Sequence, residues 1–127
     1  MTPQLELFEY IKSLTGLKFT AMLPKGSGYA AQIAPGKEDN IFFDGAKENT
    51  MSVLFLGKSK DQQELINSLY ILCNDLTAKQ EHPKNGSFQI RCINTATSPT
   101  FVCKEDGGFW VWSCVIDVHY LMKGKGK

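Results

Sequence analysis

The sequence predicts an α+β domain in which two helices pack on one face of a mostly antiparallel sheet. Apolar residues recur at helical spacing in two segments, 2–15 and 59–78. A long alternating segment, 109–122, follows a glycine-containing turn, which is typical of an antiparallel hairpin. The 127 residues suit a single domain, 1–127, that buries roughly two-thirds of its unfolded surface without disulfides or metals.

The first helix is expected over residues 2–15. Thr2 can cap it, Pro3 suits its first turn, and Gly16 can end it. Leu7 and Tyr10 either widen the buried face or contact a partner, and we favour the wider buried face. One apolar stripe repeats every three residues: Leu5, Phe8, Ile11 and Leu14.

A β region interrupted by glycine and proline follows. We expect short strands at 29–34 and 40–43, the second ending in a turn at Asp44-Gly45. The apolar run 51–56 predicts a central strand buried on both faces.

The second helix is predicted over 59–78. Ser59 and Gln62 have the spacing of a capping box, in which each side chain satisfies a backbone donor near the other residue. The helix should lie on the sheet through its apolar stripe: Leu65, Leu69, Leu72, Cys73 and Leu76.

The C-terminal third predicts three antiparallel strands, at 87–94, 100–104 and 109–122, with a turn-rich connector at 82–86 and a polar loop at 95–99. The basic tail 123–127 is expected to be flexible, either as a solvated terminus or as a non-specific contact for DNA or an acidic surface. The last strand should turn one face to the core: Trp110, Trp112, Cys114, Ile116, Val118 and Tyr120.

Composition disfavours several classes of function. The net charge is +1 and Arg91 is the only arginine, which disfavours a strong grip on nucleic acid. Residues 1–4 lack a signal-peptide pattern, and no apolar run approaches the roughly 20 residues that span a bilayer. We therefore expect no membrane partner and a protein made in a reducing cytosol.

The cysteines and histidines do not form a metal motif. The four cysteines match no zinc spacing, and His82 and His119 are the only histidines. We expect the cysteines to be small buried hydrophobic residues, with Cys92 and Cys114 close if their strands are adjacent. No metal and no cofactor is predicted.

The sequence contains no legible catalytic site, so we expect no enzyme. Asp117 and His119 lie on one face of a strand, and Ser113 is too far along that strand to act as the nucleophile. Cross-strand pairing or a solvated polar face explains the Asp–His pair better. The order Lys25-Gly26-Ser27-Gly28 reverses that of a phosphate loop and precedes a strand rather than a helix.

The last strand carries a candidate interface on its second face. This face is too apolar for open solvent, so it either meets a partner or is covered by a second layer of the same chain. The candidate residues are Phe109, Val111, Val115, Asp117, His119 and Leu121. An alternative reading is a small ligand-binding module with an aromatic pocket lined by Trp110, Trp112 and Tyr29.

The layout resembles the minor capsid or tail-completion proteins of long-tailed bacteriophages, including the tail terminators. The resemblance lies mostly in GFWVWSCVIDVHYLM (108–122) and secondarily in DQQELINSLYILCNDL (61–76), and it covers nearly the whole chain in layout. No short motif in this group is diagnostic, so no residue role carries over.

This resemblance implies a non-enzymatic virion protein that is assembled in the cytoplasm of the bacterial host. Such subunits form homo-oligomeric rings, typically of six, at the head–tail junction. The ring ends growth of the tail tube, and its partners are the tube protein and the head connector. The loops at 24–28 and 35–45 would then be candidates for ordering on assembly.

Overall fold

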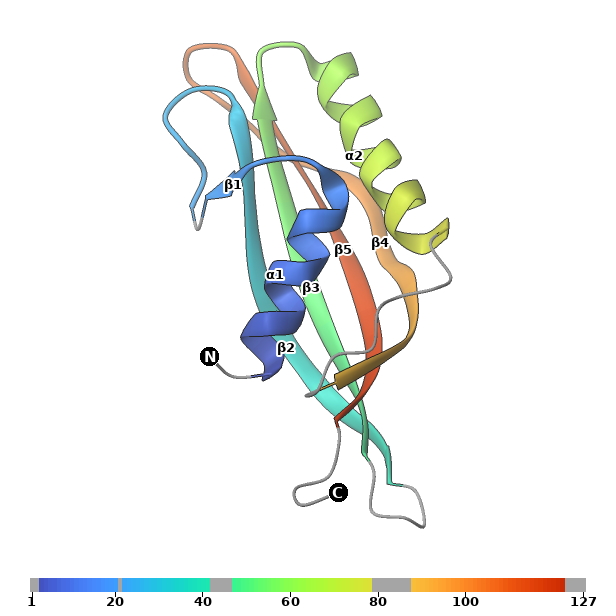
Figure 1. Cartoon of the computed structure of the whole chain (residues 1–127). Coiled ribbons are helices and arrows are strands. Elements are labelled where there is room, and N and C mark those ends of the chain that lie inside the picture. Colours follow the sequence, from blue (N-terminus) through green and yellow to red (C-terminus); the bar gives the residue numbers. More distant parts are fainter. Residues whose placement is uncertain (1–2, 21, 42–46, 79–87, 123–127) are drawn as a thin grey trace.

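The computed structural model describes residues 3–20, 22–41, 47–78 and 88–122 (Figure 1). Their sheet has the order β1-β2-β3-β5-β4, in which only the β1–β2 pair is parallel. This arrangement confirms the predicted α+β class with a mostly antiparallel sheet. The elements are α1 (Pro3–Thr15), β1 (Phe19–Thr20), β2 (Gly28–Ile41), β3 (Lys47–Ser59), α2 (Gln62–Ala78), β4 (Phe88–Glu105) and β5 (Phe109–Met122).

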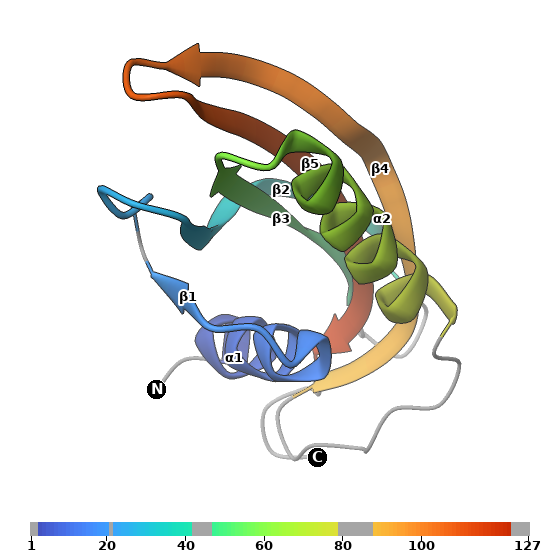
Figure 2. The same cartoon turned by 90° about the horizontal axis from the view of Figure 1, so that it is seen from above.

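Both helices lie on the same side of the sheet. Figure 2 shows the sheet curving around them, with α1 and α2 on its concave side. The core is one cluster between this side and the two helices, which confirms the predicted placement of both helices on one face. Its fully buried members include Leu7 and Ile11 of α1, Leu65 and Leu69 of α2, and Val53, Phe55, Cys114, Ile116 and Val118 of the sheet.

The buried stripe of α1 differs from the predicted one. Leu7 and Ile11 are 0% exposed and Phe8 is 9% exposed, whereas Leu5 is 45% exposed. A repeat of three drifts around a helix that has 3.6 residues per turn, so the stripe centres on the i, i+4 pair instead. The expectation for Leu5 was wrong, while Gly16 takes the predicted positive φ, at 72°.

The strands are longer and fewer than predicted. β2 runs through Pro35 with a register shift between Ala34 and Lys37, and β4 runs through the expected loop at 95–99 with shifts on either side of Thr97. Bulges accommodate these irregularities because both segments have a neighbouring strand on one side only. β4 is an edge strand, and β1 pairs only with residues 29–30 of β2, which leaves the rest of β2 at the other edge among the described residues. The short β1 was not predicted. The expected Asp44-Gly45 turn, the connector 82–86 and the tail 123–127 lie outside the described residues.

β3 is the predicted central strand, paired with β2 on one side and β5 on the other. Val53 and Phe55 point to the helices and are fully buried, whereas Leu54 and Leu56 point to the opposite face and are half-buried. The expectation of burial on both faces was therefore wrong. Within the described ranges, no helix lies over the second face.

α2 begins later than predicted and is capped differently. The carboxylate of Asp61 accepts a hydrogen bond from the Glu64 N–H (3.1 Å), and the Ser59 hydroxyl accepts one from the Asp61 N–H (3.1 Å). Asp61 is thus the N-cap, and the predicted capping box of Ser59 with Gln62 was wrong, because aspartate is at least as good a cap as serine. The predicted apolar stripe is confirmed, since all five of its residues are buried.

The β4–β5 hairpin closes as predicted. Gly107 and Gly108 have φ values of 91° and 86°, and the Gly108 N–H donates to the Glu105 carbonyl (3.2 Å). The predicted core-facing residues of β5 all belong to the core cluster or pack against it.

Candidate functional site

The candidate site is the sheet face turned away from the helices, called the open face below. The six candidate interface residues all lie on the β5 part of this face, as the alternation of the strand requires. Register pairs place β3 and β4 residues beside them. The open face includes Thr50, Ser52, Leu54, Leu56 and Lys58 of β3, the six β5 residues and Ser113, and Cys92, Asn94 and Cys103 of β4.

A row of paired polar groups crosses the open face. The Thr50 hydroxyl lies 3.0 Å from Nδ1 of His119, whose Nε2 lies 2.8 Å from the Asn94 side-chain oxygen. Beside them, the Ser52 hydroxyl donates to the Asp117 carboxylate at 2.7 Å. These bonds confirm cross-strand pairing as the explanation for Asp117 and His119. The partners on β3 and β4 were not identified from the sequence, because they depend on strand register.

Both ring nitrogens of His119 have hydrogen-bond partners within the open face. Nε2–H donates to the amide oxygen of Asn94, and Nδ1 shares a hydrogen bond with the Thr50 hydroxyl, which can donate or accept. The row therefore satisfies its own hydrogen bonds, which lowers the cost of covering it.

Thr50, His119 and Asn94 have the order of a nucleophile, a base and an orienting amide. Thr50, however, is only 7% exposed. Both β3 and β5 are paired on each side, so their N–H groups serve the sheet rather than an oxyanion. The geometry favours a structural polar row.

One corner of the open face is already covered. Pro24 lies 2.6 Å from where a Cβ on Gly28 would stand, so it sits directly on the start of β2. Lys58, 7% exposed, donates to the Pro24 carbonyl (3.1 Å) and pairs with Glu105 (2.5 Å). Its ammonium also lies 5.0 Å from the centre of the Phe109 ring.

The six candidate residues therefore differ in how accessible they are to a partner. Val111, 2% exposed, and Phe109, which also has Lys60 above its ring, lie at the covered corner. Val115 and Leu121 are half-buried, and Asp117 and His119 belong to the polar row. The surface left for a partner is centred on Val115, with Leu54 beside it in register.

The cysteines divide into two pairs, contrary to the expectation that all four are buried. Cys92 and Cys103 are exposed and lie on the open face, whereas Cys73 and Cys114 are buried against each other between α2 and β5. Cys114 therefore lies on the other side of the sheet from Cys92, so the expected proximity of these two was wrong. The thiol–thiol bond lowers the pKa of Cys73 to about 7; the same bond, reinforced by burial, raises the pKa of Cys114.

We expect two of the four thiols to react with a bulky disulfide reagent in the dilute native protein. Cys92 and Cys103 should react quickly, and Cys73 and Cys114 only after denaturation, because burial denies the reagent access even to a thiol that ionises readily. Timed thiol titration with and without guanidinium measures this. Four fast thiols in the native protein would contradict the placement of α2 on β5.

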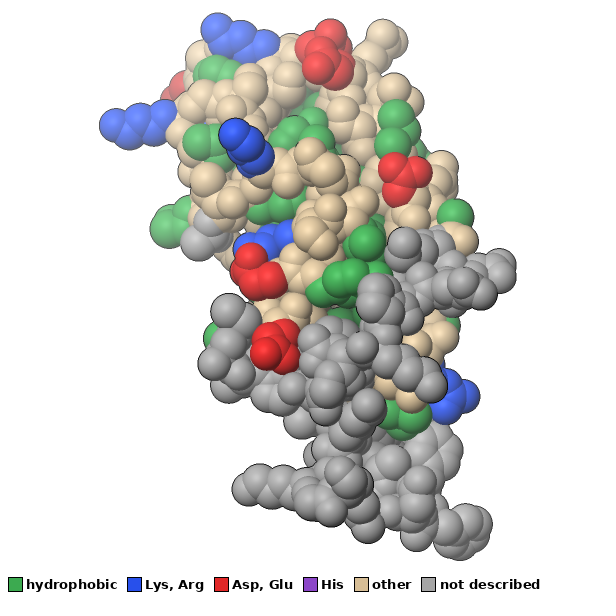
Figure 3. Space-filling view, viewed as in Figure 1, with side chains coloured by type: hydrophobic (Ala, Val, Ile, Leu, Met, Phe, Trp, Pro, Cys, Tyr) green, Lys and Arg blue, Asp and Glu red, His purple; other side chains and the backbone are tan. Residues whose placement is uncertain are grey.

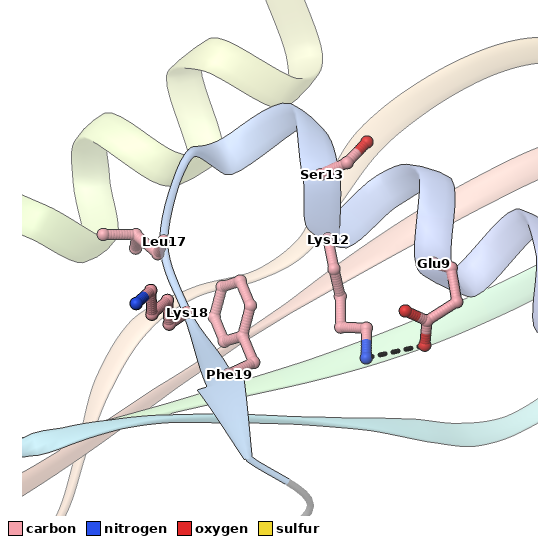
Figure 4. A pocket seen from close by; sticks show the side chains of 6 residues that line it. All are labelled: Glu9, Lys12, Ser13, Leu17, Lys18 and Phe19. Atoms are coloured by element: carbon pink, nitrogen blue, oxygen red, sulfur yellow. Dashed lines mark ion pairs between the residues drawn. The ribbon is translucent and has the colours of Figure 1, made fainter.

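An open pocket of about 410 Å³ lies where α1 leads into β1. In Figure 4, Glu9 and Lys12 point toward each other, with Phe19 beside them, whereas Leu17 and Lys18 point the other way. Lys12 pairs with Glu9 at 2.7 Å and lies over the Phe8 ring. The ammonium of Lys12 in this pocket is therefore already paired with a carboxylate.

The three residues expected to line the alternative aromatic pocket pack against the core. Tyr29, Trp110 and Trp112 are partly buried and pack against the core, and Trp112 Nε1 donates to the Gln62 side chain at 3.2 Å. Neither the pocket at α1 nor a smaller one between the helices contains any of the three aromatic residues.

Among the residues that the structure describes, the metal-ligand pattern singles out no other site. Figure 3 shows the Lys and Arg side chains of the described residues at several places on the helix-bearing side. Within the described ranges, no group of three or more His, Cys, Asp or Glu side chains could hold a metal ion. None of the described helices is long and apolar enough to cross a membrane.

No protein-family model matches the chain, and no curated protein sequence is similar enough to count as a relative.

Proposed function

We propose that this chain is a non-enzymatic, self-associating subunit of a bacteriophage particle. In this proposal it is a minor capsid or tail-completion protein that forms a ring at the head–tail junction. The ring ends growth of the tail tube and joins the tube to the head connector. The proposal makes it a virion component that assembles in the cytoplasm of the bacterial host.

The observation that carries the proposal is the open face. One side of the sheet holds the core, while the other combines half-buried apolar side chains with polar groups that already have partners. Covering such a face gains apolar burial and leaves few polar groups unsatisfied. These are the properties of a surface that a neighbouring subunit or particle component covers.

The sheet edge supports assembly through faces rather than through added strands. The outer strand β4 has four register shifts and contains Pro99, and such irregularities discourage edge-to-edge pairing. A ring also requires two different patches on each subunit that meet head to tail.

Electron microscopy tests the proposal. We expect the concentrated protein to form rings, and to cap the ends of tail tubes assembled from the major tail protein of the same genome. Val115→Asp should reduce tube capping, because it places an unpaired charge at the centre of the open face. Gln63→Asp, at an exposed position on α2, is the matched control. A protein that stays monomeric and never binds tube ends would overturn the proposal.

A further inference from the structure

The end of the β4–β5 hairpin carries an aromatic group that α2 does not cover. The Phe101 ring is 48% exposed and stands edge-on to Trp110 and Trp112, with ring centres 6.1 Å away in both cases. Trp112 is fixed by its bond to Gln62, and Lys104 lies over the Trp110 ring at 4.6 Å. Phe101 is thus an exposed aromatic side chain on a rigid support, and a cation lies over the neighbouring Trp110 ring.

A second feature lies between the helices. A pocket of about 110 Å³ opens where the end of α1 meets α2. Leu72, 2% exposed, contributes to its lining, and Ile71, 49% exposed, stands at its mouth. A cavity of roughly 150 Å³ holds a benzene ring, so this open pocket can take most of a phenyl group. This pocket, called the seam pocket below, is lined by Thr15, Leu17, Ser68, Ile71, Leu72 and Asp75.

We propose that Phe101 of one copy inserts into the seam pocket of the next copy. The charges match, since Lys104 lies over the Trp110 ring against which Phe101 packs, and the exposed Asp75 lines the pocket. Such a pair orients the contact, while the buried aromatic ring supplies most of its strength. The occupant is a second copy because both halves of the contact are present on this chain.

The contact joins different copies rather than closing within one. Phe101 rests on Trp112, which is bonded to Gln62 at the start of α2, and Ile71 lies nine residues farther along the helix. At the rise of a helix this is about 14 Å. A contact between two different patches is heterologous and propagates into a ring or a filament. The inference rests on the self-association in the proposed function and adds a contact between copies on the helix-bearing side, separate from the open face.

Sedimentation velocity of the full chain tests the inference. We expect Phe101→Ala to weaken self-association at least about tenfold, as loss of a central aromatic anchor does. Val102→Ala is the matched control, because Val102 is also 48% exposed but lies outside the aromatic support. Wild-type assembly by Phe101→Ala would overturn the inference and leave the proposed ring standing. A wild-type protein that is monomeric at every concentration would also overturn the inference, and the proposed function with it if the protein never binds tube ends.

A charge exchange keeps the test independent of the aromatic packing. Lys104→Glu and Asp75→Lys, both at exposed positions, should each weaken assembly, and the double variant should recover it. Circular dichroism confirms that each variant is folded. Absence of recovery in a folded double variant would contradict the proposed pairing of these two residues.

Discussion

Phe55→Ala is expected to lower the free energy of unfolding by about 3–5 kcal/mol, the cost of removing a fully buried phenyl ring. Phe55 is 0% exposed at the centre of β3, and its ring centre lies 5.3 Å from that of Phe19. β3 is paired with β2 on one side and β5 on the other, so its backbone has little freedom to move into the cavity left by the ring. Urea unfolding followed by tryptophan fluorescence and circular dichroism measures the loss.

Leu54→Ala is the matched control for this experiment. Leu54 is the preceding residue on the same strand but lies on the open face and is only half-buried. Its truncation should cost about 1 kcal/mol, since much of the side chain already meets solvent. Equal losses for the two variants would contradict the assignment of the core to the helix-bearing side.

Gly57→Ala is expected to destabilise the protein by about 1–3 kcal/mol through overpacking. A Cβ at this position would stand 2.4 Å from Cδ1 of Leu65 and 3.2 Å from the Tyr29 ring. Leu65 is 1% exposed, so it has no free space into which to move. Thermal and chemical unfolding of the variant measure the effect.

Gly26→Ala provides the comparison for Gly57. No atom lies within 4 Å of the added Cβ there. The substitution should change stability by less than about 0.5 kcal/mol. A neutral Gly57→Ala would mean that α2 lies farther from β3 than the structure places it.

Much of the fold is predictable because local signals and packing agree. The stripe of α2 and the alternation of β5 each match the period of their element, so the buried face follows directly. Prediction failed where tertiary context decides. Pro35 and the polar segment 95–99 look like breaks, yet sheet edges absorb them as register shifts.

For the candidate site, the sequence predicted only which residues of β5 share a face. Alternation placed the six candidate residues of β5 on one face, but strand order alone brings Thr50 and Asn94 to His119. The Cys73–Cys114 contact likewise depends on how α2 lies across the sheet. Phe109 and Val111 are covered because Lys58, more than 50 residues away in the sequence, lies over the Phe109 ring and pairs in register with Val111.

Alkylation of Cys92 tests most directly whether the open face becomes buried on assembly. Cys92 is exposed, lies on that face and pairs in register with His119. Its modification by iodoacetamide is followed by mass spectrometry in the dilute protein, in isolated rings and in rings bound to tail tubes. We expect alkylation to slow at least tenfold in rings or on tubes (about 1.4 kcal/mol of protection). Equally fast alkylation in all three states would contradict the assignment of the open face as the contact surface.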